Sequence, residues 1–227
     1  MRLSNERMVM RKNFSSRSAR SIARLFSGLL LLAGGFILPA CTSYGPAPPI
    51  LVPDPQPLPI RKTLPLSIAK IYVLPASLPQ NMEDVGTYFK NDGSYSQLVP
   101  ENPLGPSLDS ILVRQLQAGG IDAVVQQGPV DPGSSTLRIV VKEFRDKVKE
   151  GILQTTQEGR IRMDAVIILH SGDLSRRIDR SMERHSSPKP ILSFERTAPS
   201  KLLGKLYSES ISKDLVPFLR KQIGETP

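Results

Sequence analysis

Hydrophobic residues alternate with polar ones along two stretches in the second half of the chain. Over residues 136–147, Leu137, Ile139 and Val141 recur at every second position, and residues 159–170 alternate in the same way. A period of two is typical of a β-strand with one buried face. We therefore expect two long strands, each with its apolar side chains turned toward a core.

The next stretch, residues 176–185, also alternates but is dense in charge and reads RRIDRSMERH. Gly172 and Asp173 precede it and predict a hairpin turn. So many charged side chains are typical of a sheet edge, because charge opposes pairing with a second molecule. We predict an edge strand that residues 191–196 extend.

Two other segments have a helical period. In residues 107–120, apolar side chains recur every three or four positions, at Leu108, Ile111, Leu112 and Leu116. Ser107 is a residue type that caps helix N-termini, and Gly119-Gly120 predicts the end of the helix. Residues 200–223 have a similar apolar stripe, in which Pro217 predicts a kink.

Short apolar runs at residues 66–74 and 121–125 predict two further strands, the first of them buried on both faces. Residues 75–106 hold turn-forming residues and no sustained period, so we expect a long loop with one short turn at 82–89. The predicted order is β, α, β, β, β, β, α. It indicates an α/β (α+β) domain over residues 66–227, with a mainly antiparallel sheet and both helices packed on one face.

The first 40 residues combine a basic start with a short apolar run. Residues 1–24 are rich in arginine, and residues 25–39 read LFSGLLLLAGGFILP. This order is typical of a secretory signal peptide, since the apolar run is shorter than the roughly twenty residues of a membrane-spanning helix. We predict a signal peptide over residues 1–40. An uncleaved signal anchor in the inner membrane is the alternative.

The single cysteine of the chain, Cys41, follows this run directly. Leu38-Pro39-Ala40-Cys41 resembles a bacterial lipobox in its aliphatic first residue and in the small residue before the cysteine, although Pro39 departs from the usual small or β-branched residue. The resemblance implies cleavage ahead of Cys41 and acyl chains such as palmitate at that residue. Thr42, where inner-membrane lipoproteins carry Asp, favours the periplasmic face of the outer membrane. A free cysteine beside an apolar run is the alternative.

Eight of the twenty residues from 46 to 65 are proline. Proline fixes the backbone in an extended form and removes hydrogen-bond donors, so this stretch predicts neither a helix nor an inner strand. We interpret residues 41–65 as the lipidated cysteine and a proline-rich tether that holds the domain off the membrane. A ligand for an SH3-like partner is the alternative.

The formal net charge of +9 is concentrated at the N-terminus. Residues 1–40 contribute +6, which leaves +3 for the rest of the chain. A domain that binds nucleic acid needs clustered basic residues with aromatic side chains for stacking, whereas this chain has no Trp and 5% aromatic residues. We therefore exclude nucleic acid as a partner.

Candidate catalytic groups are scattered through the sequence. His170 and His185 have no ligand residue at the spacing that a zinc-binding helix requires, and Asp164 stands alone in its strand. The glycine motifs of nucleotide-binding loops are absent from the predicted domain. We predict no catalytic, cofactor-binding or metal-binding residue, and no enzymatic activity.

The densest basic cluster lies in the predicted edge strand, at Arg176, Arg177, Arg180 and Arg184. An anionic partner, such as lipid head groups or an acidic polymer, would suit these side chains. The alternative is a solvated strand whose charges only prevent aggregation.

Several segments of the domain resemble the YajG-like family of small bacterial lipoproteins. They are Lys70-Ile71-Tyr72-Val73, Glu83-Asp84-Val85-Gly86, SLDSILVRQLQAGG at residues 107–120, and the predicted strands at 137–144 and 161–170. More loosely, the chain is similar to PelC- and CsgG-type periplasmic lipoprotein domains. The family has no assigned reaction, so the resemblance implies an anchored periplasmic domain without catalytic residues.

An anchor, a tether and a domain without a candidate active site predict a non-enzymatic accessory, scaffolding or assembly factor of the cell envelope. The membrane is then a partner through the lipid anchor, and envelope proteins or a second copy are further candidates. The alternative is an auxiliary lipoprotein of a lipid or polysaccharide export machine. Such a protein would bind its channel or cargo through the edge strand or the groove between helices and sheet.

Overall fold

The computed structural model describes residues 46–59, 70–80 and 82–224 of the chain. The predicted signal peptide, Cys41 and residues 60–69 lie outside this description.

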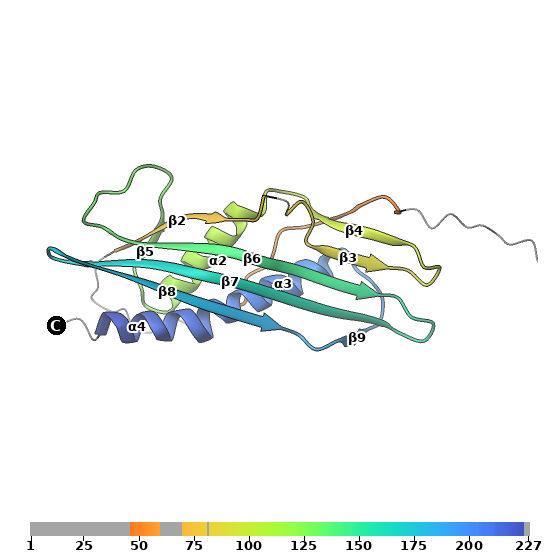
Figure 1. Cartoon of the computed structure of the whole chain (residues 1–227). Coiled ribbons are helices and arrows are strands. Elements are labelled where there is room, and N and C mark those ends of the chain that lie inside the picture. Colours follow the sequence, from red (N-terminus) through yellow and green to blue (C-terminus); the bar gives the residue numbers. More distant parts are fainter. Residues whose placement is uncertain (1–45, 60–69, 81, 225–227) are drawn as a thin grey trace, which may run out of the picture. The chain divides into compact units, whose positions relative to one another are not determined.

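Three long antiparallel strands form one side of the sheet (Figure 1). They are β6 (Ser135–Lys149), β7 (Thr155–Ser171) and β8 (Leu174–His185). The alternation predicted for residues 159–170 is confirmed, and that of residues 136–147 holds as far as Val141, after which an irregularity shifts the buried positions by one residue; each strand buries one face. Gly172 has a φ of +58°, a left-handed conformation that suits glycine in the predicted turn before β8.

Two groups of shorter strands share the other edge of β6. The first half of β6 pairs with β2 (Ile71–Ser77), which carries β5 (Ala123–Val125) on its far side. The second half pairs with β3 (Gly86–Phe89), which continues to β4 (Tyr95–Pro100) and then to β1 (Ile50–Val52).

The prediction of a mainly antiparallel sheet is wrong, because the sheet is mixed. Among the described residues, four strand pairings are parallel, namely β1–β4, β2–β5, β2–β6 and β3–β6, and four are antiparallel. One reason is that residues 75–106, which were expected to form a loop, contain the β3–β4 hairpin. Its strand β3 pairs in parallel with β6. A strand as short as β3 is invisible to a pattern of period two, because its one fully buried position is Gly86.

Residues 191–196 do not extend β8 as predicted. Instead β9 (Lys189–Ile191) pairs with the first residues of β7, beside the position where β8 ends. The edge of β7 is thus shared by β8 and β9.

The helices cover one face of the sheet, as predicted. These are α2 (Leu104–Ala118) and a long C-terminal helix made of α3 (Thr197–Ser210), a π-helical turn η1 (Ile211–Leu215) and α4 (Val216–Gly224). The core between sheet and helices is mostly apolar. Its side chains that are less than 2% exposed include Leu137, Ile139, Phe144, Ile161, Met163, Leu108, Leu112, Tyr207 and Leu219. The opposite face of the sheet is polar, with exposed Arg138, Lys142 and Arg162.

Two helix details differ from prediction. α2 begins at Leu104 and Ser107 does not cap it, because the Ser107 hydroxyl donates instead to Asp54 Oδ2 at 2.9 Å. In the C-terminal helix, the π turn η1 precedes Pro217 and contains Lys213, four residues before it. An α-helical proline ring clashes with the carbonyl four residues earlier, so a widened turn at this position accommodates Pro217.

Part of the predicted tether is packed on the domain. Ile50–Val52 forms β1, and residues 53–58, here called the strap, cross α3 and α2. The Ser200 hydroxyl donates to the Pro53 carbonyl, the Gln56 amide donates to the Ser200 carbonyl at 3.3 Å, and the Leu58 amide donates to Ser208 Oγ at 3.2 Å. An extended proline-rich segment has few internal hydrogen bonds, and here its free backbone groups are satisfied by helix side chains and carbonyls. The folded domain therefore starts before residue 66.

Candidate functional site

The predicted edge strand is confirmed. In the described part of the chain β8 pairs with β7 alone, so its other edge has no strand partner. Alternation places Arg176, Arg180 and Arg184 on the side of β8 that faces the C-terminal helix, together with Met182, which is 5% exposed. Figure 1 shows β8 running along this helix.

Three of the predicted anion-contact arginines have partners within the chain. Arg176 donates a hydrogen bond to Gln222 Oε1, and the Arg180 guanidinium lies 5.2 Å from the centre of the Phe218 ring. Arg177, on the opposite side of the strand, forms an ion pair with Asp179 at 3.3 Å. The first two contacts attach β8 to α4.

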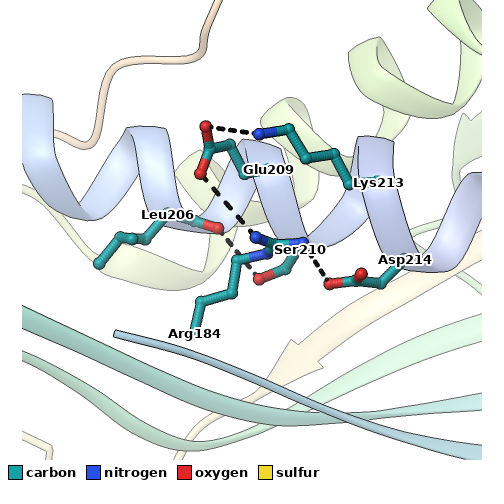
Figure 2. Close-up of polar contacts among 6 residues, drawn as sticks. All are labelled: Arg184, Leu206, Glu209, Ser210, Lys213 and Asp214. Atoms are coloured by element: carbon teal, nitrogen blue, oxygen red, sulfur yellow. Dashed lines mark hydrogen bonds and ion pairs between the residues drawn. The ribbon is translucent and has the colours of Figure 1, made fainter. Parts of the chain in front are cut away.

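The fourth arginine, Arg184, lies between two carboxylates of the C-terminal helix (Figure 2). Its Nη2 donates to Asp214 Oδ2 at 2.8 Å, and its Nη1 lies 4.0 Å from Glu209 Oε2. Lys213 binds the other oxygen of Glu209 at 2.9 Å. The Arg184 side chain is 23% exposed, so this cluster is half-buried rather than a free surface charge.

The π turn explains how both carboxylates reach one guanidinium. Glu209 and Asp214 are five residues apart, and a regular α-helix would separate their side chains around its axis. A π turn has its hydrogen bonds between residues five apart and so brings such positions toward the same side. The sequence feature behind this geometry is Pro217, which requires the widened turn and from which a kink was predicted.

The electrostatics of the cluster favour ionised carboxylates. Partial burial acts to raise the pKa of Glu209, but the hydrogen bond from Lys213 and the charges of Lys213, Lys205 and Arg184 together lower it. With its charge matched in this way, Arg184 is a brace between β8 and the helix. We expect Arg184→Met to lower the free energy of unfolding by about 1.5–3 kcal/mol, the range for a hydrogen bond to a charged group.

Urea denaturation of the purified protein checks this expectation, with Arg177→Met as the matched control. Arg177 is 67% exposed and pairs only at the surface, so its loss should change stability by less than about 1 kcal/mol. Equal effects of the two substitutions would show that Arg184 is no brace.

Because the arginine side chains already have partners, the free hydrogen-bonding groups of β8 belong to its main chain. Twelve residues of strand present one unpaired edge in the part of the chain that the structure describes. Such an edge accepts an added strand from an extended peptide, with backbone hydrogen bonds providing affinity. The candidate site is therefore the outer edge of β8, held in place by the C-terminal helix.

The other candidate groups from the sequence do not converge. His185 is opposite Arg160 in the β7–β8 register and His170 is ten residues further along β7, a separation of about 33 Å. Asp164 contacts Lys142 Nζ and accepts a 2.7 Å hydrogen bond from Ser181. Both contacts lower the pKa of Asp164, and the contact with Lys142 has the larger effect. No cluster of three potential metal ligands occurs among the described residues. Cys41 lies outside them.

Sequence reasoning missed Asp146, a carboxylate in the core that is 1% exposed. Its Oδ2 accepts a 2.5 Å hydrogen bond from Gln157 Nε2, while its Oδ1 has no hydrogen-bond partner in the described structure. Burial raises the pKa of Asp146 to about 7, although hydrogen bonds from Gln157 and the Lys147 backbone oppose the rise. The register of β6 shifts between Val141 and Glu143, and this irregularity moves Phe144 and Asp146 to the buried face.

Comparison with known proteins supports a family assignment. A family model described as "Uncharacterized lipoprotein" matches residues 81–213. No curated protein matches the chain. No helix in the described residues is long and apolar enough to cross a membrane.

Two solved structures are similar to the chain at low sequence identity. A protein from Xanthomonas campestris assigned to family DUF330 is 16% identical, with a TM-score of 0.54 over 78% of this chain and 99% of that one. A minor lipoprotein from Acinetobacter baumannii is 16% identical, with a TM-score of 0.33 over 69% of this chain and 91% of that one. The first of these likenesses supports the α+β fold.

Proposed function

The chain belongs to the YajG-like family of uncharacterised lipoproteins, and from this membership we propose that it is a lipid-anchored accessory protein of the cell envelope. Residues 1–40 are removed as a signal peptide, Cys41 carries the acyl chains, and the domain faces the periplasm from the outer membrane. Two or more acyl chains make such an anchoring stable. The protein contributes a binding surface to an assembly and carries out no reaction of its own.

The observation that carries the binding role is the outer edge of β8, which pairs with no strand among the described residues. Its twelve residues are braced by the Arg184 cluster and by the contacts of Arg176 and Arg180 with α4. A strand held rigidly at a sheet edge is pre-organised for strand addition, because less chain entropy is lost when a partner pairs with it. The favoured partner is therefore an extended segment of an envelope protein.

Site-specific photo-crosslinking in intact cells tests this role. A photoreactive side chain at Ser175, exposed in β8, should form a discrete adduct with one envelope protein. The matched control is Arg138, which is exposed on the same polar face of the sheet but lies in β6, away from the edge. A channel or transporter subunit in the adduct would favour the alternative, an auxiliary lipoprotein of an export machine. Identical patterns from both positions, or no adduct from Ser175, would contradict docking at β8.

A further inference from the structure

Four large apolar side chains are exposed at one end of the long strands. The exposed fractions are 95% for Ile152, 97% for Leu153, 106% for Leu192 and 41% for Tyr95. These four residues are called the apolar tip. Single exposed apolar residues are common on soluble domains, but a contiguous group of large ones marks a surface that contacts a protein or a membrane.

Contacts among three chain segments bring the apolar tip together. The Asn91 amide donates to Glu150 Oε2 at 3.4 Å, so the β3–β4 hairpin, which carries Tyr95, touches the β6–β7 turn. Thr155 pairs with Ile191, so the start of β7, which directly follows the β6–β7 turn, lies beside the end of β9, which directly precedes Leu192. Figure 1 shows the β3–β4 hairpin and the β6–β7 turn at one end of the sheet and the β7–β8 turn at the other.

The described chain also enters the domain at the apolar tip. The Ala47 amide donates a 2.9 Å hydrogen bond to the Tyr95 carbonyl. Ala47 comes only six positions after Cys41, and even a fully extended chain covers six positions in at most about 20 Å. If Cys41 carries the lipid, as the proposed function states, the tip is held within about that distance of the bilayer.

The charges around the tip suit a membrane interface. The ends of the same hairpins and β9 carry Lys90, Lys147, Lys149 and Lys189, against the three carboxylates Asp92, Glu150 and Glu158, the last of which lies opposite Lys147 in the β6–β7 register. Lysine side chains lay their apolar stems along a membrane surface and keep the ammonium group in water, and they attract anionic head groups. Tyr95 is a residue type that favours the head-group region.

We propose that the apolar tip inserts into the bilayer that holds the anchor, with Ile152 and Leu153 deepest, and so fixes the orientation of the domain on the membrane. This inference rests on the proposed lipid anchor. Insertion orients the long strands away from the bilayer, and β8 then points into the periplasm.

Tryptophan quenching by brominated lipids tests the insertion, because the chain has no Trp of its own. The full-length protein, purified from membranes, is reconstituted into vesicles of phosphatidylethanolamine and phosphatidylglycerol with brominated acyl chains. Leu153→Trp should show blue-shifted emission that the brominated lipid quenches strongly. Leu174→Trp is the matched control: Leu174 is 77% exposed but lies at the β7–β8 turn, and its emission should stay unquenched.

Vesicle flotation of the same samples separates the two hypotheses. Protein that floats while Leu153→Trp and Leu174→Trp are equally unquenched would overturn insertion but leave the anchor intact. Protein that fails to float would overturn the anchor and, with it, the insertion. A blue shift of Leu153→Trp that grows with protein concentration without lipid quenching would assign the tip to contacts between copies and overturn the proposal.

Discussion

Asp146→Asn should stabilise the protein at pH 8 by several kcal/mol and by much less at pH 5. Asp146 is 1% exposed and one of its oxygens has no hydrogen-bond partner in the described structure, so the ionised form is poorly solvated there. A rise of its pKa from 3.8 to about 7 corresponds to about 4 kcal/mol. Asparagine is neutral at every pH and keeps an oxygen for the hydrogen bond from Gln157.

The direction in which Asp146 changes the stability with pH follows from proton uptake. Between pH 4 and pH 7 the folded protein holds a proton on Asp146 that the unfolded chain has released. The contribution of this group to stability is therefore full below about pH 4, falls as the pH rises, and levels off above about pH 7. The advantage of Asp146→Asn over the parent should grow by about 2–3 kcal/mol between pH 5 and pH 8.

Urea denaturation at several pH values measures this growth. Asp164→Asn is the control, and its effect on stability should have the opposite sign. The pKa of Asp164 is lowered by Lys142 and Ser181, so its ionised form stabilises the fold at neutral pH and loses that effect as the pH falls. Asp164→Asn should therefore be mildly destabilising at pH 8. A pH-independent effect of Asp146→Asn would contradict a buried, proton-binding Asp146.

Gly204→Ala should detach the strap from α3. A Cβ at Gly204 would overlap the Gln56 carbonyl and lie 2.5 Å from the Gln56 nitrogen, and backbone atoms cannot yield as a flexible side chain can. Ser200 and Ser208, one helical turn away on each side, hold the strap by hydrogen bonds that would be lost as well. We expect a net loss of about 1–3 kcal/mol of unfolding free energy, the usual cost of overpacking.

Hydrogen exchange at the amides of Gln56 and Leu58 reports the strap directly. Both amides donate to α3 in the folded protein and should lose protection in Gly204→Ala. Gly105→Ala is the matched control, because Gly105 is also helical and a Cβ there meets nothing within 4 Å. That substitution should leave exchange unchanged and stabilise α2 slightly, by up to about 1 kcal/mol. Unchanged protection in Gly204→Ala would mean that the strap does not contact the helix as described.

The long elements of this fold are predictable from sequence, and the reasons for the failures are local. β6 and β7 have one apolar face each, and the helical stripes are regular, so period alone identifies them, whereas β8 is recognised by its alternating charged residues. β1 is hidden because Ile50–Val52 stands between prolines, and its pairing with β4 depends on an edge position where proline neighbours are tolerated.

The candidate site was predictable in position but not in chemistry. The charge of residues 176–185 correctly indicates an edge strand. Sequence could not show that Arg176, Arg180 and Arg184 turn toward the C-terminal helix, because their partners lie 30 or more positions away in the chain. Asp146 was hidden by the register irregularity in β6, which a strict alternation cannot anticipate.

Mass spectrometry of the N-terminal peptide, from inner and outer membranes separated by density, tests the lipid anchor on which the proposed envelope role depends. We predict that Cys41 is the mature N-terminus, that it carries acyl chains, and that the modified peptide is found in the outer-membrane fraction. A peptide in the inner-membrane fraction that still contains residues 22–40 and has an unmodified Cys41 would contradict this prediction. It would indicate a signal-anchored protein instead.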